Sequence, residues 1–317
     1  MLLPTIWQYI LSFTLLYSAL AIILLQHLPK DNTSITLLQK VSHIKEKETM
    51  PRQLLSVPLG VVRLGNHLFK YAAGYGIAKD RGAEFCVEQP TFRFTIFKGP
   101  FVKQCRTTPD YTIVEKKFGF RDNRFYEPLG KYKHIGIRRY FQCFEYFNQY
   151  KSEIQNMFEI KDKVKKKAKQ YLQQISKNND DKLTCFHFRL GDMSWNNEGM
   201  TLPEKQYYIK SINMIRKETT QNLFLIISDE PSKASENLSY LKDYATTVVS
   251  HGNLHTDFTI MATLCDNIVF SRGTFAWWAA YLNKKATVYY RDEFINNYMT
   301  LDVNRDTYYL PEWIHVK

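Results

Sequence analysis

The sequence lacks the short motifs of several common enzyme classes. No GxxxxGK[ST] loop occurs in its 317 residues, which argues against P-loop nucleotide hydrolases and sulfotransferases. No GxGxxG follows the first predicted strand, so the dinucleotide fingerprint is missing. A Gx[ST]xG nucleophile elbow and the metal–diphosphate motif Asp-x-Asp are absent as well. Any nucleotide site must therefore use other side chains to bind phosphate.

Cysteine is scarce and unpatterned. The five cysteines contain no CxxC pair, so we expect no zinc site. In a secretory compartment Cys86 could form a disulfide with Cys105. Cys185 and Cys265 have apolar neighbours, and we expect them to fill the core.

Charge is missing from one segment, Leu2–Leu28, which contains no Asp, Glu, Lys or Arg. Its length and apolar character predict a transmembrane helix that contacts the lipid bilayer. A cleaved signal peptide is the alternative, because Ala19-Leu20-Ala21 resembles a cleavage site. The apolar run continues through Leu25, which favours an uncleaved anchor.

The flanks of this segment give conflicting signals about orientation. No Lys or Arg precedes it and Lys30 follows it, which mildly favours a cytoplasmic catalytic body. Asn-x-Ser/Thr sequons at Asn32 and Asn237 favour a luminal one. The net charge of +12 comes largely from residues 161–169 and 131–139. The first cluster fits a solvated helix face, and no nucleic-acid-binding motif accompanies it, so we expect no nucleic-acid partner.

The hydrophobic pattern divides the chain into an anchor at 1–28, a polar stem at 29–56, and domains at 57–178 and 179–317. Strands are expected at 54–62 and 83–88, with a helix at 67–79 between them. The pattern does not order the elements of residues 90–140. It predicts one long helix over 146–175, followed by a domain boundary at the turn-like run 177–182.

Apolar strands alternate with helices through the second half of the chain. A parallel sheet covered on both faces is therefore expected there. Ligands of such sheets bind outside the carboxyl ends of the strands. The predicted strands span 182–190, 222–228, 246–250, 267–271 and 286–290. The predicted helices span 203–218, 231–244, 256–266 and 274–283.

Polar residues follow the first of these strands in the run CFHFRLGDM. His187 and Arg189 alternate along the strand and are expected to share a face, with Asp192 just beyond. A guanidinium binds phosphate through paired, charge-assisted hydrogen bonds. The alternative for Arg189 is a structural salt bridge to Asp192.

A second candidate phosphate contact comes from the run SRGTFAWWAAYL. Ser271 ends a strand, Gly273 permits a tight turn and Thr274 begins a helix, whose N-terminus attracts anions. Adjacent helix positions face about 100° apart. We therefore expect one or both of Trp277 and Trp278 to lie in the core.

Acidic residues supply the remaining candidates. Asp229 and Glu230, after Ser228, could bind a ribose or a base edge, or could cap the following helix. Asp257 stands at a predicted helix start, where an N-cap role is expected.

Four motifs in order resemble the α-1,2-fucosyltransferase family, glycosyltransferase family 11. They are VVRLGNHLFKYAAGYGIA, HFRLGD, the tripeptide Ser-Asp-Glu at 228–230, and DFTIMATLCDNIVFSRGTFAWWAAYL. The closing YYLPEWI is similar to the family pattern too. The chain departs from that pattern in the first motif and in the second, where Leu190 replaces an arginine. The departures of the first motif are Val62, His67 and Leu68.

The resemblance implies an α/β fold of the GT-B type, with two Rossmann-like domains facing a cleft behind the membrane helix. It implies a type II Golgi enzyme with a luminal catalytic body. This enzyme would move fucose from GDP-fucose to a galactose hydroxyl of a β-galactoside-terminated glycan, with inversion and without a metal or other cofactor.

The resemblance also assigns roles to residues of this chain. Arg189 and His187 would be catalytic, together with Asp192, which is the nearest candidate general base ahead of Glu198. The donor would contact Gly65, Asn66, Ser228, Asp229, Glu230, Asp257, Ser271, Gly273, Thr274 and Phe275. A competing hypothesis is a membrane-anchored sugar-binding relative without turnover, which the altered first motif favours.

Overall fold

The computed structural model describes residues 52–60, 62–89, 94–117, 119–176, 181–190, 204–218, 222–270, 273–291 and 304–317. Within these ranges, no helix combines the length and the apolar character that crossing a bilayer requires. The predicted anchor, and all but the last residues of the predicted stem, lie outside them. Residues 53–317 form one compact unit.

The first sheet has four parallel strands in the order β2-β1-β4-β3. The predictions at 54–62 and 83–88 are confirmed, although both strands are shorter than expected. β3 and β4 come from the region that the sequence left unordered. The strands are β1 (Leu54–Val57), β2 (Glu84–Val87), β3 (Tyr111–Val114) and β4 (His134–Arg138).

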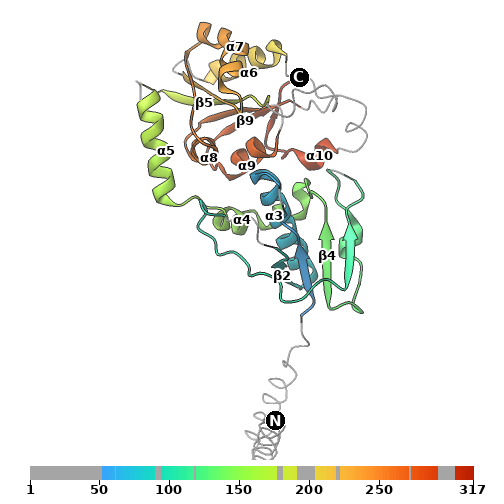
Figure 1. The fold of residues 1–317 in the computed structure, drawn as a ribbon. Helices are drawn as coiled ribbons and strands as arrows, with labels where there is room; N and C mark the ends of the chain where they lie inside the picture. The colour runs from blue at the N-terminus through green and yellow to red at the C-terminus, as the bar shows by residue number, and fades with distance from the viewer. Residues whose placement is uncertain are drawn as a thin grey trace, which may run out of the picture. The chain divides into compact units, whose positions relative to one another are not determined.

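The helix α3 (Leu64–Arg81) connects β1 to β2 (Figure 1). It confirms the helix predicted at 67–79 and begins three residues earlier. Gly82 ends it with φ +64, a left-handed conformation that glycine adopts without a Cβ penalty. The disulfide between Cys86 in β2 and Cys105, which the sequence suggested, is present.

The second sheet has six parallel strands in the order β10-β9-β8-β5-β6-β7. Its five predicted strands are confirmed, and the short β10 is an addition. The chain enters at β5, moves outward to β7, and returns to the other side of β5 with β8. The strands are β5 (Lys182–His187), β6 (Asn222–Ile227), β7 (Thr246–Val249), β8 (Asn267–Phe270), β9 (Thr287–Tyr290) and β10 (Ile314–His315).

The topology of this sheet marks one place for a ligand. Because β5 and β8 are neighbours whose connections leave in opposite directions, a ligand is expected outside their carboxyl ends. Helices accompany the strands. Four were predicted from the sequence: α6 (Lys205–Glu218), α7 (Pro231–Asn237), α8 (Leu254–Thr263) and α9 (Thr274–Leu282). The short α10 (Arg305–Tyr308) is an addition. The 3-10 helix η6 (Ser239–Asp243) completes the second of the predicted helical ranges.

The prediction of one helix over 146–175 is wrong. The chain forms α4 (Lys151–Met157) and α5 (Asp162–Ile175), with an extended segment between them. That segment pairs with residues 96–98: the Lys98 N–H donates to Glu159 O, and the Lys161 N–H donates to Ile96 O. Three 3-10 helices also lie in this half: η1 (Asn123–Tyr126), η2 (Phe144–Tyr146) and η3 (Asn148–Tyr150).

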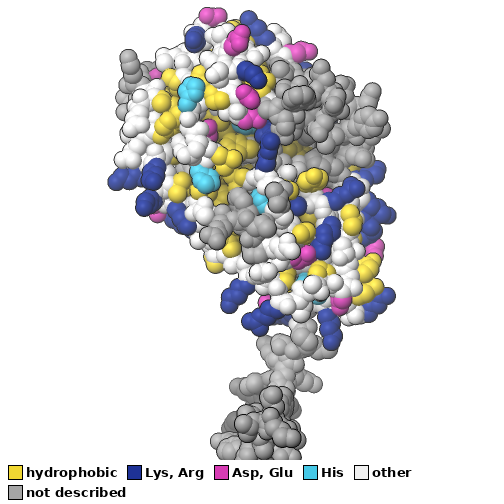
Figure 2. All heavy atoms as spheres, in the orientation of Figure 1, with side chains coloured by type: hydrophobic (Ala, Val, Ile, Leu, Met, Phe, Trp, Pro, Cys, Tyr) yellow, Lys and Arg dark blue, Asp and Glu magenta, His cyan; other side chains and the backbone are white. Residues whose placement is uncertain are grey.

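The lysine-rich cluster at 161–169 is a solvated face, as expected. Ala168 is the buried residue of α5, and Figure 2 shows Lys and Arg side chains gathered at the lower end of this helix. On its inner side α5 packs against α8.

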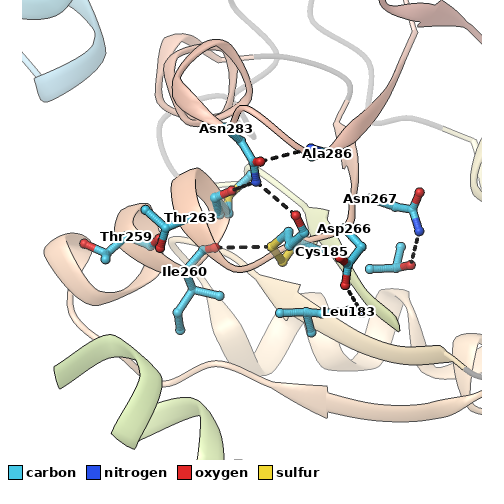
Figure 3. Close-up of a disulfide and its surroundings, with 12 residues drawn as sticks. Leu183, Cys185, Thr259, Ile260, Thr263, Asp266, Asn267, Asn283 and Ala286 are labelled. Carbon is cyan, nitrogen blue, oxygen red and sulfur yellow. Dashed lines mark hydrogen bonds between the residues drawn. A yellow bond between two sulfur atoms is a disulfide. The ribbon is translucent and has the colours of Figure 1, made fainter. Parts of the chain in front are cut away.

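Two expectations about buried residues can be compared with the structure, one for the tryptophans and one for the cysteines. Trp277 and Trp278 are both fully buried. Cys185 and Cys265 are buried too, but they form a disulfide with each other (Figure 3). The expectation that they only fill space was therefore wrong. Asn283 supports this region by donating from Nδ2 to Cys265 O at 3.0 Å.

Candidate active site

The carboxyl end of β5 places His187 and Arg189 beside the end of β8. His187 pairs in register with Ile227 on one side and Phe270 on the other. The Phe188 N–H still donates to Ile227 O at 2.9 Å, so the backbone stays extended as far as Arg189. Because alternate residues of extended backbone share a face, the two side chains project together.

The side chains of His187 and Arg189 lie next to Gly273, the residue before α9. A Cβ built on this glycine would lie 3.3 Å from Arg189 Cδ and 3.8 Å from His187 Cε1. Both side chains therefore pass beside the first turn of α9, which confirms that they share a face. Gly273 also has φ +99, which a residue with a Cβ rarely adopts.

The start of α9 is suited to an anion. Its N-cap, Gly273, provides no side-chain hydrogen bond to the first turn. The first N–H groups of a helix have no partner within the helix, and the helix dipole adds positive potential there. Thr274 begins this helix, as the sequence suggested. Ser271 lies outside the described residues.

An ion pair with Asp229 orients Arg189. Arg189 Nη1 lies 3.8 Å from Asp229 Oδ2, and Asp229 Oδ1 accepts a hydrogen bond from the Leu190 N–H at 2.9 Å. The arginine side chain is 13% exposed. A guanidinium binds phosphate through charge-assisted hydrogen bonds. Asp192 and Glu198 lie outside the described residues.

His187 rests on an aromatic ring from α9. Its ring is nearly parallel to that of Phe275, with centroids 5.5 Å apart, and the residue is 4% exposed. Phe275, which the resemblance places among the donor contacts, thus supports His187 from the side of α9.

The tripeptide Ser228–Glu230 follows β6 at the same edge of the sheet. The Glu230 N–H donates to Ser228 Oγ at 3.0 Å. Glu230 is the N-cap of α7 but makes no side-chain cap bond, and the Asp229 carboxylate binds residues of the β5 loop. The capping alternative therefore holds for the position of Glu230 but not for a capping hydrogen bond, and Asp229 does not cap the helix.

The N-cap prediction for Asp257 is wrong as well. Asn253 caps α8 by accepting a hydrogen bond from the Thr256 N–H at 3.0 Å. Asp257 lies one turn further along, is 6% exposed, and accepts a hydrogen bond from Ser250 Oγ just after β7. Burial raises the pKa of Asp257 to about 6, and the hydrogen bond from Ser250 opposes this shift.

Gly65 brings the first turn of α3 onto the first turn of α9. A Cβ on Gly65 would lie within 2.5 Å of the Thr274 carbonyl oxygen and Oγ1, and Figure 1 shows the two helices meeting there. The next residue, Asn66, accepts a hydrogen bond from Gln142 Nε2 at 3.0 Å. Sequence reasoning missed Gln142, because it follows a strand that the hydrophobic pattern did not predict.

The departures from the family pattern are accommodated by packing. Leu68 and Leu190 are buried among apolar side chains. His67 is 2% exposed, and burial lowers its pKa to about 4, so it is neutral at physiological pH. Leu190 therefore contributes to the core where the family has a further positive charge.

One group among the described residues has the geometry of metal ligands: Cys86, Cys105 and His134. The two cysteines are joined in a disulfide, and a metal needs the free thiolates. We therefore assign no metal to this group.

Known proteins share both the sequence and the fold. The chain is 23% identical over 295 residues to galactoside alpha-(1,2)-fucosyltransferase 2 of Oryctolagus cuniculus, which covers 84% of this chain and 78% of that one. It is 25% identical over 308 residues to a putative glycosyltransferase of Caenorhabditis elegans, with 84% and 81% covered.

A variant of Arabidopsis thaliana FUT1 in complex with GDP shares the fold. It matches with a TM-score of 0.52 at 13% identity and covers 77% of this chain and 70% of that one. The model of the family described as Glycosyl transferase family 11 matches residues 32–317. The chain therefore belongs to glycosyltransferase family 11.

Proposed function

We propose that this glycosyltransferase moves L-fucose from GDP-β-L-fucose to O2 of a terminal β-galactoside, with inversion and without a metal ion. The observation that carries the proposal is the packing of His187 and Arg189 against Gly273 at the carboxyl ends of β5 and β8. The name of the rabbit relative, an alpha-(1,2)-fucosyltransferase, supports the sugar and the linkage.

The chemistry of the donor explains this arrangement. When the fucosyl–oxygen bond breaks, negative charge develops on the β-phosphate of GDP, and fixed positive groups must stabilise it. Arg189 supplies a guanidinium held by Asp229, and the first turn of α9 supplies backbone N–H groups. His187 lies beside them and orients the diphosphate. The absence of Asp-x-Asp from the sequence agrees with a reaction that these groups support alone.

In a GT-B arrangement the two sheets bind different substrates, one the donor and the other the acceptor. The second sheet holds GDP, with Asp229, Glu230 and Asp257 near the ribose and base. The first sheet contacts the donor site through Gly65 and Asn66, and it offers its own carboxyl edge to the acceptor. Asp192 remains the candidate general base for the acceptor hydroxyl.

The disulfides support a secretory location for the catalytic body. Both disulfides of the described residues join buried or half-buried cysteines, and such bonds persist in oxidising compartments. Together with the charge-free segment 2–28, they favour a luminal Golgi enzyme of type II topology.

A transfer assay tests the proposal. The purified full chain is incubated with GDP-fucose and a printed glycan array, with and without EDTA, and the linkage of the product is determined by NMR. We expect fucose on terminal β-galactosides in α-1,2 linkage, at a rate that EDTA leaves unchanged. GDP-fucose binding with neither transfer nor GDP release would instead support the sugar-binding relative without turnover.

A further inference from the structure

The loop after β4, Arg139–Gln142, has an unusual backbone. Arg139 has φ +104 and Phe141 has φ +54, values that residues with a Cβ rarely adopt. Such strain persists where surrounding contacts impose it, and it concentrates at sites of function. We call this segment the β4 loop.

Buried contacts hold the β4 loop in place. The Phe141 N–H donates to Glu115 Oε2 at 3.1 Å, and the Tyr146 hydroxyl lies 3.2 Å from Glu115 Oε1. Glu115 is 1% exposed. Arg138, at the base of the loop, forms a two-point ion pair with Glu88, with N–O distances of 2.7 and 2.9 Å.

Glu115 itself does not act on a substrate. Burial raises its pKa to about 7, a value suited to a general base. However, the carboxylate is buried and both of its oxygens contact groups of the protein. Its geometry is that of a residue that positions the loop.

The β4 loop presents one aromatic ring to solvent. Phe141 and Gln142 are buried, whereas Tyr140 between the strained positions is 46% exposed. Tyr140 follows the end of β4 by two residues. It therefore lies at the carboxyl edge of the first parallel sheet, the edge at which ligands of such sheets bind.

Contacts link the β4 loop to the donor site. Gln142 donates to Asn66, and the adjacent Gly65 touches Thr274 at the start of α9. On the other side of that turn, Gly273 contacts Arg189. These contacts connect the β4 loop, which carries the exposed ring of Tyr140, to the proposed phosphate site.

We propose that Tyr140 is the residue on which the acceptor sugar stacks, and that Glu115 positions it by holding the β4 loop in its strained conformation. The inference rests on the proposed function and names a specificity determinant of the same site. An aromatic ring offers a rigid apolar face, and its hydroxyl offers a hydrogen bond, which suits the face of a pyranose bearing hydroxyl groups.

Kinetics of the Tyr140→Ala variant test the stacking role. Lactose and the best acceptor from the glycan array serve as probes at saturating GDP-fucose. We expect the acceptor KM to rise about tenfold, with unchanged KM for GDP-fucose and unchanged GDP release without acceptor. Tyr140→Phe keeps the ring and should stay within threefold of the unmodified chain. An acceptor KM within twofold for Tyr140→Ala would overturn the proposal.

The matched control is Tyr111→Ala. Tyr111 is an exposed tyrosine of the same sheet, 37% accessible, but it begins β3 and therefore lies at the opposite edge. Its removal should leave both KM values unchanged. An equal rise of acceptor KM in this variant would show that any exposed ring of the sheet has the effect, and would also overturn the assignment.

A pair of Glu115 variants tests the positioning role. Glu115→Gln keeps an oxygen for the Phe141 N–H and should preserve the acceptor KM within threefold. Glu115→Leu removes both oxygens. It should raise the acceptor KM as Tyr140→Ala does and speed hydrogen exchange of the β4 loop. If Glu115→Leu does not fold, the acceptor KM values of Glu115→Gln and of the Tyr140 variants still test the proposal. A folded leucine variant with unchanged acceptor KM would contradict the role.

The two proposals fail in different ways. If the unmodified chain transfers fucose to no glycan on the array, the proposed function is wrong and this inference falls with it. If the chain transfers fucose but the Tyr140 and Glu115 variants match it, only this inference is wrong.

Discussion

Arg189 combines a permanent charge with restricted access to water. Its side chain is 13% exposed and lies between Asp229 and the first turn of α9. A fixed cation in such surroundings stabilises developing charge far better than one in bulk water. Asp229 should therefore be regarded as the residue that orients this guanidinium.

Replacement of Arg189 tests the residue directly. Arg189→Ala should lower kcat about 100- to 1,000-fold while the thermal unfolding midpoint changes little. Arg216→Ala, in the exposed last turn of α6, is the matched loss of one positive charge and should leave kcat unchanged. Near-normal turnover in Arg189→Ala would refute the assignment.

The raised pKa of Asp257 predicts a pH dependence of the unfolding free energy. Its pKa is raised from 3.8 to about 6 in the folded chain, so the folded state holds the proton more tightly than the unfolded state. The contribution of Asp257 to stability is therefore complete below pH 3.8 and is lost as the pH rises through 6. Relative to Asp257→Asn, the chain should lose at most about 3 kcal/mol over this window. Urea unfolding of both proteins from pH 3.5 to 7 measures the difference; a constant difference would contradict the buried environment.

Among the helices and strands, the contact between α3 and α9 connects the two sheets at the site. Gly65 permits it, because any Cβ would collide with Thr274. Gly65→Ala should therefore cost about 2 kcal/mol of folding stability and lower kcat at least tenfold, because the first turn of α9 must shift.

The control for this variant is Gly130→Ala. Gly130 has no atom within 4 Å of a built Cβ, so the same added methyl group should change neither the unfolding free energy nor kcat. An unchanged kcat in Gly65→Ala would show that the position of α9 does not depend on this contact.

Whether the sequence predicts a helix or strand depends on how completely that element is buried and on which residues it pairs with. Strands of the second sheet are covered on both faces and read as apolar runs, so the sequence predicts them well. β4 carries His134, Gly136 and Arg138, which obscure that pattern. The break between α4 and α5 depends on pairing with residues 96–98, which lie about 60 residues away in sequence. Helical periodicity within residues 146–175 cannot predict such a distant contact.

At the scale of the whole molecule, the candidate site was predictable where it depends on local geometry. His187 and Arg189 share a face because of strand alternation, and Thr274 begins a helix because Gly273 precedes it. The ion pair of Arg189 with Asp229 depends on which strands become neighbours. The same holds for the disulfide between Cys185 and Cys265, which are 80 residues apart.

That disulfide should stabilise the whole unit. Closing a loop of this length restricts the unfolded chain, with an entropic ceiling of about 4.5 kcal/mol. The double variant Cys185→Ala with Cys265→Ala should lower the unfolding free energy towards that limit. Peptide mapping without reduction should recover the Cys185–Cys265 pair from the unmodified chain; free thiols at these two positions would contradict the assignment.

We propose that the second sheet binds the diphosphate of GDP through Arg189 and the first turn of α9, without a metal ion. A crystal structure of the chain with GDP, grown in the presence of EDTA, tests this proposal. We expect the β-phosphate in contact with the Arg189 guanidinium and with N–H groups at the start of α9. GDP bound elsewhere, or bound at this site only when a divalent cation replaces EDTA, would contradict it.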